Sequence, residues 1–412
     1  MAAAPPGAQA AQIDLEAAYR QMPILPEHKP YLAIRTERGL YADHCNPFGL
    51  SSSAGILGMA VEAAVDIVKA SLHMDCLAKW VDDMIPTRVP VDVAVPECGS
   101  IYPASRAGGK GPSSTPRNYP YELEDVLAIF LDLGFKIKLD KLKDFASCCV
   151  YNGFAWDLQA KVVSLPEEKR GKYLKCILVA LDPGTELFLK EAQTLQGFLA
   201  HVCFVYREGR AHMPSIHRYV KSFNDNISYR QAIPEETYLD LEWWSAILSM
   251  SDFGRPLHIR SLVDLDIWVD ASTVWGIALV VGNQYQAWKL REGWDTENRH
   301  IGWAESVAIE LAVVYITRAG YQDVQVLVHS DNTGAIGQFS RGRSRNRNIN
   351  DSIIRAEALC RGCNISIFPD YVKSAVNRAD AASRGTPQPD LTPLTPSVEL
   401  PAEIEHLFIR PI

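Results

Sequence analysis

The sequence lacks any apolar run that approaches the ~20 residues of a membrane-spanning helix, so we expect no membrane partner. Its first residues, MAAAPPGAQAAQ, lack the basic and apolar regions of a secretory signal peptide. The nine cysteines have no framework spacing, and the CxxC of Cys360 and Cys363 has no second pair to complete a zinc site. We therefore expect an intracellular protein, cytoplasmic or nuclear, with reduced thiols.

An excess of positive charge is also missing, because the 412-residue chain has a formal net charge of −8. The chain as a whole is therefore not an electrostatic binder of nucleic acid, and such binding would need local basic patches. A content of 47% hydrophobic and 22% charged residues is typical of a globular protein, and the length allows two or three domains. Neither composition nor length indicates an oligomeric state.

Hydrophobic periodicity predicts a mixed N-terminal part and a mainly helical middle. Helices are expected over 55–72, 122–134, 165–222 (in several pieces) and 236–250, and a hairpin over 76–89. Residues 251–262 are interpreted as a linker. The stretch 98–121 is rich in Pro, Gly and Ser and has no acidic residue, which predicts a mobile loop within 91–121. Its basic residues, available to a polyanion, are Arg106, Lys110 and Arg117.

From residue 263 the pattern becomes mixed α/β, with three consecutive strands and then a helix over 303–320. A buried strand, a helical stretch and a last strand follow, so the order β-β-β-α-β-α-β suits one compact domain with a mixed five-stranded sheet. The Pro-rich tail after Gly385 is expected to be loosely ordered. We expect an α+β chain divided into the segments 1–160, 161–255, 256–390 and 391–412.

Four acids of the C-terminal part stand out: three lie at the ends of predicted strands or at the start of a helix, and Asp380 lies near the end of the domain. Asp270 and Asp331 each end a strand, and a helix packed on the sheet can bring Glu305 beside them. A strand-end carboxylate among apolar residues is costly unless a cation or donors compensate it. With Asp380, such a cluster can bind two divalent cations about 3.5–4 Å apart, which suits phosphodiester hydrolysis.

The segments DIWVDAS, HIGWAESVAIELAV, VHSDNTGAI and VNRADAASR, in this order, resemble the RNase H domain of retroelement polyproteins. The resemblance implies two Mg²⁺ (or Mn²⁺) ions held by Asp270, Glu305, Asp331 and Asp380, and cleavage of RNA in RNA/DNA hybrids. Glu310 is an alternative to Glu305. The loop DYVKSAVNRAD lacks the histidine of the cellular enzymes, so slow turnover is expected.

Residues 13–158 resemble the palm of a retrotransposon reverse transcriptase of the LTR or DIRS type. The segments that carry this resemblance are DLEAAYRQMPI, NPFGLSSSAG, WVDD, LGFKIKLDKLKDF and CVYNGFAWDL. It implies that Asp14 and Asp82 hold two further ions with Asp83 close by, where a template–primer and a dNTP would meet. Tyr19 would lie under the sugar, Phe48 and Gly49 would contact the nucleotide, and Lys141 or Lys143 would donate a proton to pyrophosphate.

Thirteen residues precede Asp14, so we expect the fingers to be missing and polymerisation to be impaired. The helical stretch after 165 is placed like a thumb, with Lys169, Arg170, Lys172 and Lys175 near its start. In SRGRSRNRN (340–348) four arginines stand at alternate positions and are expected to contact phosphates. Two alternatives are a relic of the same fold that binds nucleic acid without turnover and, less well supported, an unrelated two-metal nuclease.

Overall fold

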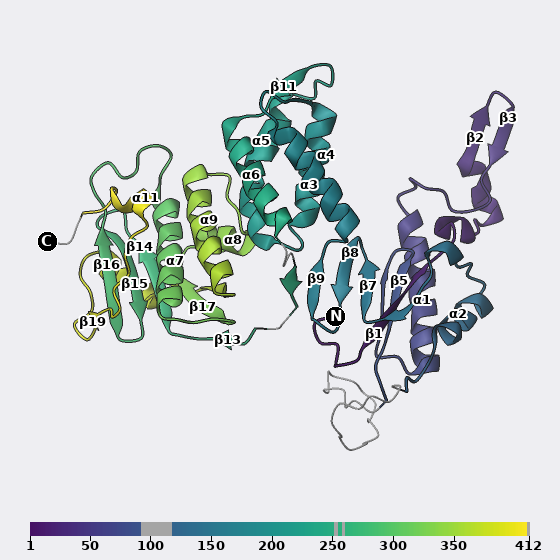
Figure 1. The fold of residues 1–412 in the computed structure, drawn as a ribbon, viewed down its shortest axis with the longest axis horizontal. Helices are drawn as coiled ribbons and strands as arrows, with labels where there is room; N and C mark the ends of the chain where they lie inside the picture. The colour runs from purple at the N-terminus through teal and green to yellow at the C-terminus, as the bar shows by residue number, and fades with distance from the viewer. Residues whose placement is uncertain (92–117, 251–253, 258–259, 410–412) are drawn as a thin grey trace. The chain divides into compact units, whose positions relative to one another are not determined.

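The computed structural model describes residues 1–91, 118–250, 254–257 and 260–409 (Figure 1). Most of the loop expected over 91–121, with Arg106, Lys110 and Arg117, lies outside these residues. The chain forms two compact units, Met1–Glu167 with Gly254–His258, and Glu168–Phe253 with Ile259–Ile412. The helical middle and the C-terminal α/β part, which we expected as separate domains, therefore belong to one unit.

The first unit is built on a four-stranded antiparallel sheet in the order β4-β5-β1-β6. These strands are β1 (Gln9–Asp14), β4 (Cys76–Trp80), β5 (Asp83–Arg88) and β6 (Lys143–Ala146). The predicted helices form as α1 (Ser53–Leu72) and α2 (Leu123–Asp132), and their apolar residues share a core with the sheet. The predicted hairpin is confirmed, because β4 pairs with β5, and the turn holds Val81 and Asp82 while Asp83 begins β5.

Smaller elements complete this unit. A second sheet has the order β12-β9-β8-β7, and an exposed hairpin joins β2 to β3. Their bounds are β2 (Ala33–Thr36), β3 (Gly39–Ala42), β7 (Cys148–Tyr151), β8 (Phe154–Asp157), β9 (Val162–Ser164), β12 (Arg255–Pro256), η1 (Ala18–Gln21), η2 (Pro26–Leu32) and η3 (Leu139–Lys141).

The interpretation of 251–262 as a plain linker was wrong, because part of it is the edge strand β12. Gly254, just before β12, permits the chain to lie close to β9, because a Cβ on residue 254 would lie 2.6 Å from Val162 Cγ1. A second part of the same stretch forms β13 (Leu262–Val263), which pairs with a strand of the second unit. Strands of two residues leave no periodicity in a sequence, so neither was visible beforehand.

The helical part of the second unit confirms the predicted helices and adds a short hairpin. Its elements are α3 (Glu167–Leu181), β10 (Glu186–Phe188), α4 (Leu189–Val202), η4 (Arg207–His212), α5 (Pro214–Ser222), β11 (Arg230–Ala232) and α6 (Glu235–Ser249). The unpredicted strands β10 and β11 pair antiparallel over three residues each.

The other part of this unit is a mixed sheet covered by helices, which confirms the α+β class. All five predicted strands form, and the short strands β13 and β19 extend the sheet to seven. The strands are β14 (Ile267–Ala271), β15 (Gly276–Val281), β16 (Gln284–Lys289), β17 (Gln325–Ser330), β18 (Ser366–Tyr371) and β19 (Thr392–Pro393). The helices are α7 (Ile301–Arg318), α8 (Thr333–Arg341), α9 (Arg347–Gly362), α10 (Asp380–Ser383) and α11 (Ala402–Glu405), with η5 (Ser374–Val376).

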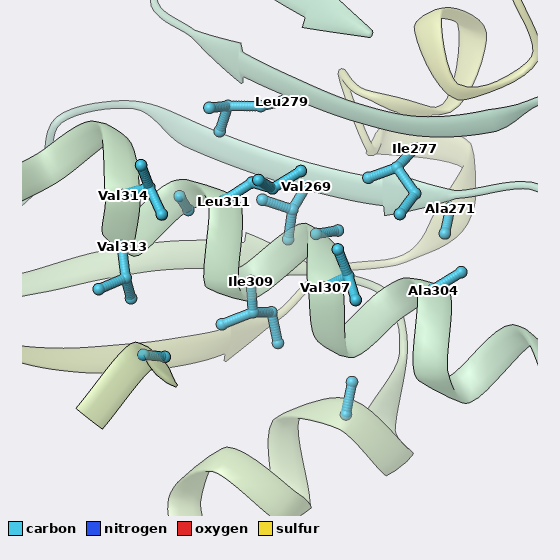
Figure 2. Close-up of a cluster of buried hydrophobic side chains, with 14 of the residues drawn as sticks. Val269, Ala271, Ile277, Leu279, Ala304, Val307, Ile309, Leu311, Val313 and Val314 are labelled. Carbon is cyan, nitrogen blue, oxygen red and sulfur yellow. The ribbon is translucent and has the colours of Figure 1, made fainter. Parts of the chain in front are cut away.

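Helix α7 is the centre of this core and is buried on nearly every side. Figure 2 shows its residue Leu311 beside Val269 of β14, within a cluster of aliphatic side chains. A helix that is apolar all round must be covered by neighbours, and α7 packs on β14, β15 and α9. This packing fixes the start of α7 against the end of β14, where the acidic residues lie.

The expectation of a loosely ordered tail after Gly385 was wrong. Strand β19 pairs with β16, and six apolar side chains of the tail are buried: Leu391, Leu394, Val398, Ile404, Leu407 and Phe408. Proline content suggested disorder, but these apolar residues recur every few positions and cover the core. Within the described residues, no helix combines the length and apolar character needed to cross a bilayer.

Candidate active sites

Three acids meet at one end of the second unit's sheet. Strands β14 and β17 run parallel with Trp268 opposite His329, so the residues two positions further along, Asp270 and Asp331, lie at the same sheet end. The first turns of α7 add Glu305. One ligand oxygen from each of these three acids lies within 4.8 Å of the others, and no other such trio of His, Cys, Asp or Glu occurs among the described residues.

Two acids of the trio are buried and Asp331 is half-buried, an arrangement that calls for a cation. Asp270 and Glu305 are 4% and 5% exposed. Burial, followed by the charge of Asp331, raises the pKa of Asp270 to about 7. Burial and the charge of Asp270 raise the pKa of Glu305 to about 9. The buried Oε2 of Glu305 has no hydrogen-bond partner. Three carboxylates with an unsatisfied oxygen are a donor set that fits Mg²⁺ or Mn²⁺.

Polar residues that sequence reasoning missed hold Asp270 in place. Ser383 Oγ donates to Asp270 Oδ2. Asn377 Nδ2 donates to the carbonyl of Val269 at 3.1 Å and to Asp270 Oδ1 at 3.4 Å. Both belong to the segment VNRADAASR, whose hydroxyl and amide groups were the only sequence signal for such a role. Such partners orient a metal-binding carboxylate and contribute to metal affinity.

Asp380 lies near the trio but is held by another residue. Its charge contributes to the raised pKa of Asp270. The Arg384 guanidinium donates to both of its oxygens, with Nη2 2.8 Å from Oδ1 and Nε 3.1 Å from each oxygen. The expected set of four acids is therefore a close trio with a fourth acid in an ion pair.

The alternative acid Glu310 is fully committed elsewhere. Its side chain is buried and accepts from Arg355 Nε at 2.6 Å and Arg355 Nη2 at 2.8 Å. Ser352 Oγ donates to it at 2.7 Å. A carboxylate in a buried bidentate pair has no free oxygen for a metal ion, so the geometry favours Glu305.

The first unit brings two of its three predicted acids together. Strands β1 and β5 pair with Asp14 directly opposite Asp83. Burial, then a hydrogen bond with Asp14, raises the pKa of Asp83 to about 6. Asp82 occupies the turn after Val81, whose φ of 57° is unusual for a β-branched residue. Among the described residues, these three acids do not form a trio as close as that around Asp270.

Lys141 supplies the positive charge next to Asp14. Its Nζ lies 2.7 Å from Asp14 Oδ2, and this hydrogen bond raises the pKa of Lys141. Lys143, which was equally plausible by spacing, is exposed on β6. The 3-10 turn η3 thus directs Lys141 to the predicted site.

The residues expected around a nucleotide also meet. The rings of Tyr19 and Phe48 contact edge to face, with centroids 4.7 Å apart. Phe48 is 76% exposed, and Gly49 follows it with a φ of 88°, a conformation that favours glycine. An exposed ring beside a tight turn can contact a planar ligand.

The arginine run, which we expected to contact phosphates, lies on the surface. Arg341, Arg343, Arg345 and Arg347 are exposed, whereas Gly342 and Ser344 between them are buried. The run joins the end of α8 to the start of α9. Because α8 begins next to Asp331, one short helix connects the acidic trio to the arginines.

No family model and no curated protein matches the chain. Solved structures of a foamy viral protease-reverse transcriptase are similar to this chain at low identity. The form called dRH with double-stranded DNA is 15% identical, with a TM-score of 0.42 and coverage of 88% of this chain and 57% of that one. The complex with RNA/DNA hybrid is 13% identical, with a TM-score of 0.44 and coverage of 95% and 46%. A complex with double-stranded DNA is 14% identical, with a TM-score of 0.40 and coverage of 88% and 68%.

The chain thus spans about half the length of the first two structures. At these identities and TM-scores, the likeness carries no conclusion about activity, substrate or partners.

Proposed function

We propose that the second unit is a metal-dependent ribonuclease that cuts the RNA strand of RNA/DNA hybrids, within a retrotransposon reverse transcriptase/RNase H polyprotein. The observation that carries the proposal is the close trio of Asp270, Glu305 and Asp331, in which the first two are buried and Glu305 has an unsatisfied oxygen. Closely spaced carboxylates of this kind can hold divalent cations. Phosphodiester hydrolysis by two metal ions depends on such a cluster of carboxylates.

Asp270, Glu305 and Asp331 would hold a divalent ion, and Asp380 would contribute to a second. The bound ions would supply positive charge that stabilises the developing negative charge on the phosphate oxygens. Ser383 and Asn377 keep the Asp270 carboxylate oriented through their hydrogen bonds.

The test is cleavage of a labelled RNA/DNA hybrid in Mg²⁺ by Asp331→Asn, which keeps size and removes charge. We expect the rate to fall by at least about a hundredfold, as loss of metal affinity predicts. Asp390→Asn is the matched control, because Asp390 is exposed in the tail. Unchanged cleavage by Asp331→Asn, in a preparation free of host nuclease, would refute the assignment.

For the first unit we propose the metal-binding acids of an RNA-directed DNA polymerase whose primer extension is impaired, on the observation that Asp14 faces Asp83 with Lys141 Nζ 2.7 Å from Asp14 Oδ2. The test is extension of oligo(dT) on poly(rA) with dTTP and Mg²⁺. Asp14→Asn should abolish any extension, and Asp132→Asn, an exposed acid at the end of α2, should not. Extension that persists in Asp14→Asn would contradict this proposal.

A relic that binds nucleic acid without turnover is the second candidate function. Two side-chain cations favour it, because they occupy acids that an enzyme would use for metal: Lys141 pairs with Asp14, and Arg384 pairs with Asp380. Hybrid binding without Mg²⁺-dependent cleavage by the wild-type chain would support the relic and exclude the enzyme.

A further inference from the structure

Five arginines of the second unit gather where the helical part meets α8 and α9. They are Arg207 and Arg210 of η4 and Arg341, Arg343 and Arg345 of the arginine run, and we name them together the arginine surface. All but the half-buried Arg210 are exposed. None of the five forms an ion pair with another described residue, in a chain whose net charge is −8. Unpaired cations concentrated on an acidic protein indicate an anionic partner.

The loop that carries three of these arginines is braced by hydrogen bonds. The Ser344 amide donates to Asn350 Oδ1 at 3.0 Å. Asn346 Nδ2 donates to the carbonyl of Asn298, and Asn348 Nδ2 to that of Glu297, both at 2.8 Å. The arginines are therefore presented from a fixed backbone, so less conformational entropy is lost on binding.

Contacts with η4 make the two groups of arginines neighbours. Asn350 Nδ2 donates to the carbonyl of Ala211 at 2.7 Å, which ties α9 to η4. A Cβ on Gly342 would lie 3.8 Å from both the Arg207 carbonyl and Arg210 Cβ. The charges of Arg210 and Arg343 both act on the buried thiol of Cys203. The loop thus runs directly over η4.

Two acids lie close enough to the arginines of η4 to interact with them, because the charge of Arg207 acts on Glu208 and the charges of Arg207 and Arg210 act on Glu357. Neither acid forms an ion pair with a described arginine of the arginine surface. Arg347, at the end of the run, differs, because it lies near Glu236 and Asp351 and its charge acts on both. We therefore leave Arg347 out of the arginine surface.

The distance from this surface to the acidic trio follows from α8. The helix has nine residues and begins one position after Asn332, so it spans about 13 Å at 1.5 Å per residue. The Arg341 side chain folds back along α8. Its Nη1 lies 3.2 Å from the point that a Cβ on Gly337 would occupy. On a duplex that rises 3.4 Å per base pair, the roughly 13 Å from the acidic trio to the near edge of the arginine surface corresponds to about four base pairs.

We infer that the arginine surface, which joins Arg207 and Arg210 of the helical part to three arginines of the run, binds the phosphate backbone of a nucleic-acid duplex, with its near edge about four base pairs from the acidic trio. This inference rests on the proposed function of the second unit. It assigns a substrate-binding role to η4, an element outside the segment that carries the acids.

The test measures hybrid binding without catalysis. Fluorescence anisotropy of a labelled RNA/DNA hybrid in EDTA, between about 50 and 200 mM KCl, gives the slope of log Kd against log salt. R207Q/R210Q should reduce the slope by about two units and R207Q alone by about one, because each lost phosphate contact removes about 0.9. R207K/R210K keeps both charges and should restore the slope.

The control double variant is R218Q/R318Q, which removes the same charge from arginines that are paired with Glu236 and Glu399. It should leave the slope within a few tenths of the wild-type value. A wild-type slope in both R207Q/R210Q and R207Q would overturn the inference, even if Asp331→Asn abolishes cleavage. A slope reduced by two units, with cleavage undiminished in Asp331→Asn, would support the arginine surface and contradict the proposed reaction.

Discussion

Arg384 holds the carboxylate of Asp380 by three hydrogen bonds, one helical turn further along the chain. The trio of Asp270, Glu305 and Asp331 forms without Asp380. A second ion at Asp380 must therefore compete with a resident guanidinium, whereas an ion at the trio meets no such competitor.

We predict that Arg384→Gln binds a second Mn²⁺ ion more tightly than the wild type. Arg384 is exposed, and exposed ion pairs are weak, so the gain should be about two- to fivefold in dissociation constant. Titration of free Mn²⁺ by electron paramagnetic resonance measures both sites. Asp380→Asn should weaken the second site alone, and an Arg384→Gln variant that binds both ions like the wild type would show that the pair does not compete.

Metal binding at the trio should release protons. At pH 7 Glu305, with a pKa of about 9, is protonated, and Asp270, with a pKa of about 7, is half protonated. An ion needs both carboxylates ionised, so roughly one and a half protons should leave on binding. Calorimetry in buffers of different ionisation enthalpy counts them. No proton release at pH 7 would mean that the trio is already ionised or is not the binding site.

The same shift predicts how the metal-free stability depends on pH. The pKa of Glu305 is raised from 4.5 to about 9 in the folded chain. The contribution of Glu305 to the free energy of unfolding is complete below about pH 4.5. It is lost as the pH rises through 9, because the folded state retains a proton that the unfolded chain releases. The loss is at most about 1.4 kcal/mol per pH unit.

Urea unfolding in EDTA at several pH values, followed by tryptophan fluorescence, measures this decline in the free energy of unfolding. In Glu305→Gln the decline should be clearly shallower, whereas Glu292→Gln, at an exposed position, should follow the wild type. If Glu305→Gln declines as steeply as the wild type, the buried proton lies elsewhere.

Most of the second unit could be predicted from its periodicity, because long buried elements such as α7 and β17 leave a clear pattern. Elements of two or three residues, such as β10 and β12, leave none. The tail shows a different limit: its prolines suggested disorder, but burial of Leu394 and Phe408 decides its structure.

Site residues were predictable by type but not by partner. The sequence contained both Glu305 and Glu310, and only packing shows that Arg355 holds the second. Spacing left Lys141 and Lys143 equivalent, because the orientation of η3 depends on tertiary contacts. The pairing of Asp380 with Arg384 at a spacing of four could have been inferred from DAASR, since such pairs face each other on a helix.

Lys141 and Asp14 form an ion pair in the first unit. Asp14 is 4% exposed, so its carboxylate is expensive to leave without a cation. Removal of one partner from a buried pair costs about 3–5 kcal/mol, but the Lys141 side chain is 50% exposed and solvent weakens the interaction. We therefore expect Lys141→Met to lower the free energy of unfolding by about 1–2 kcal/mol in EDTA.

Mg²⁺ should stabilise Lys141→Met more than the wild type, because the ion no longer competes with the ammonium group for Asp14. Thermal unfolding with and without Mg²⁺ measures both effects. Lys143→Met is the matched control, and its change should stay within about 0.5 kcal/mol because Lys143 is exposed. If the two lysine variants behave alike in EDTA and in Mg²⁺, then Lys141 neither compensates Asp14 nor competes with an ion there.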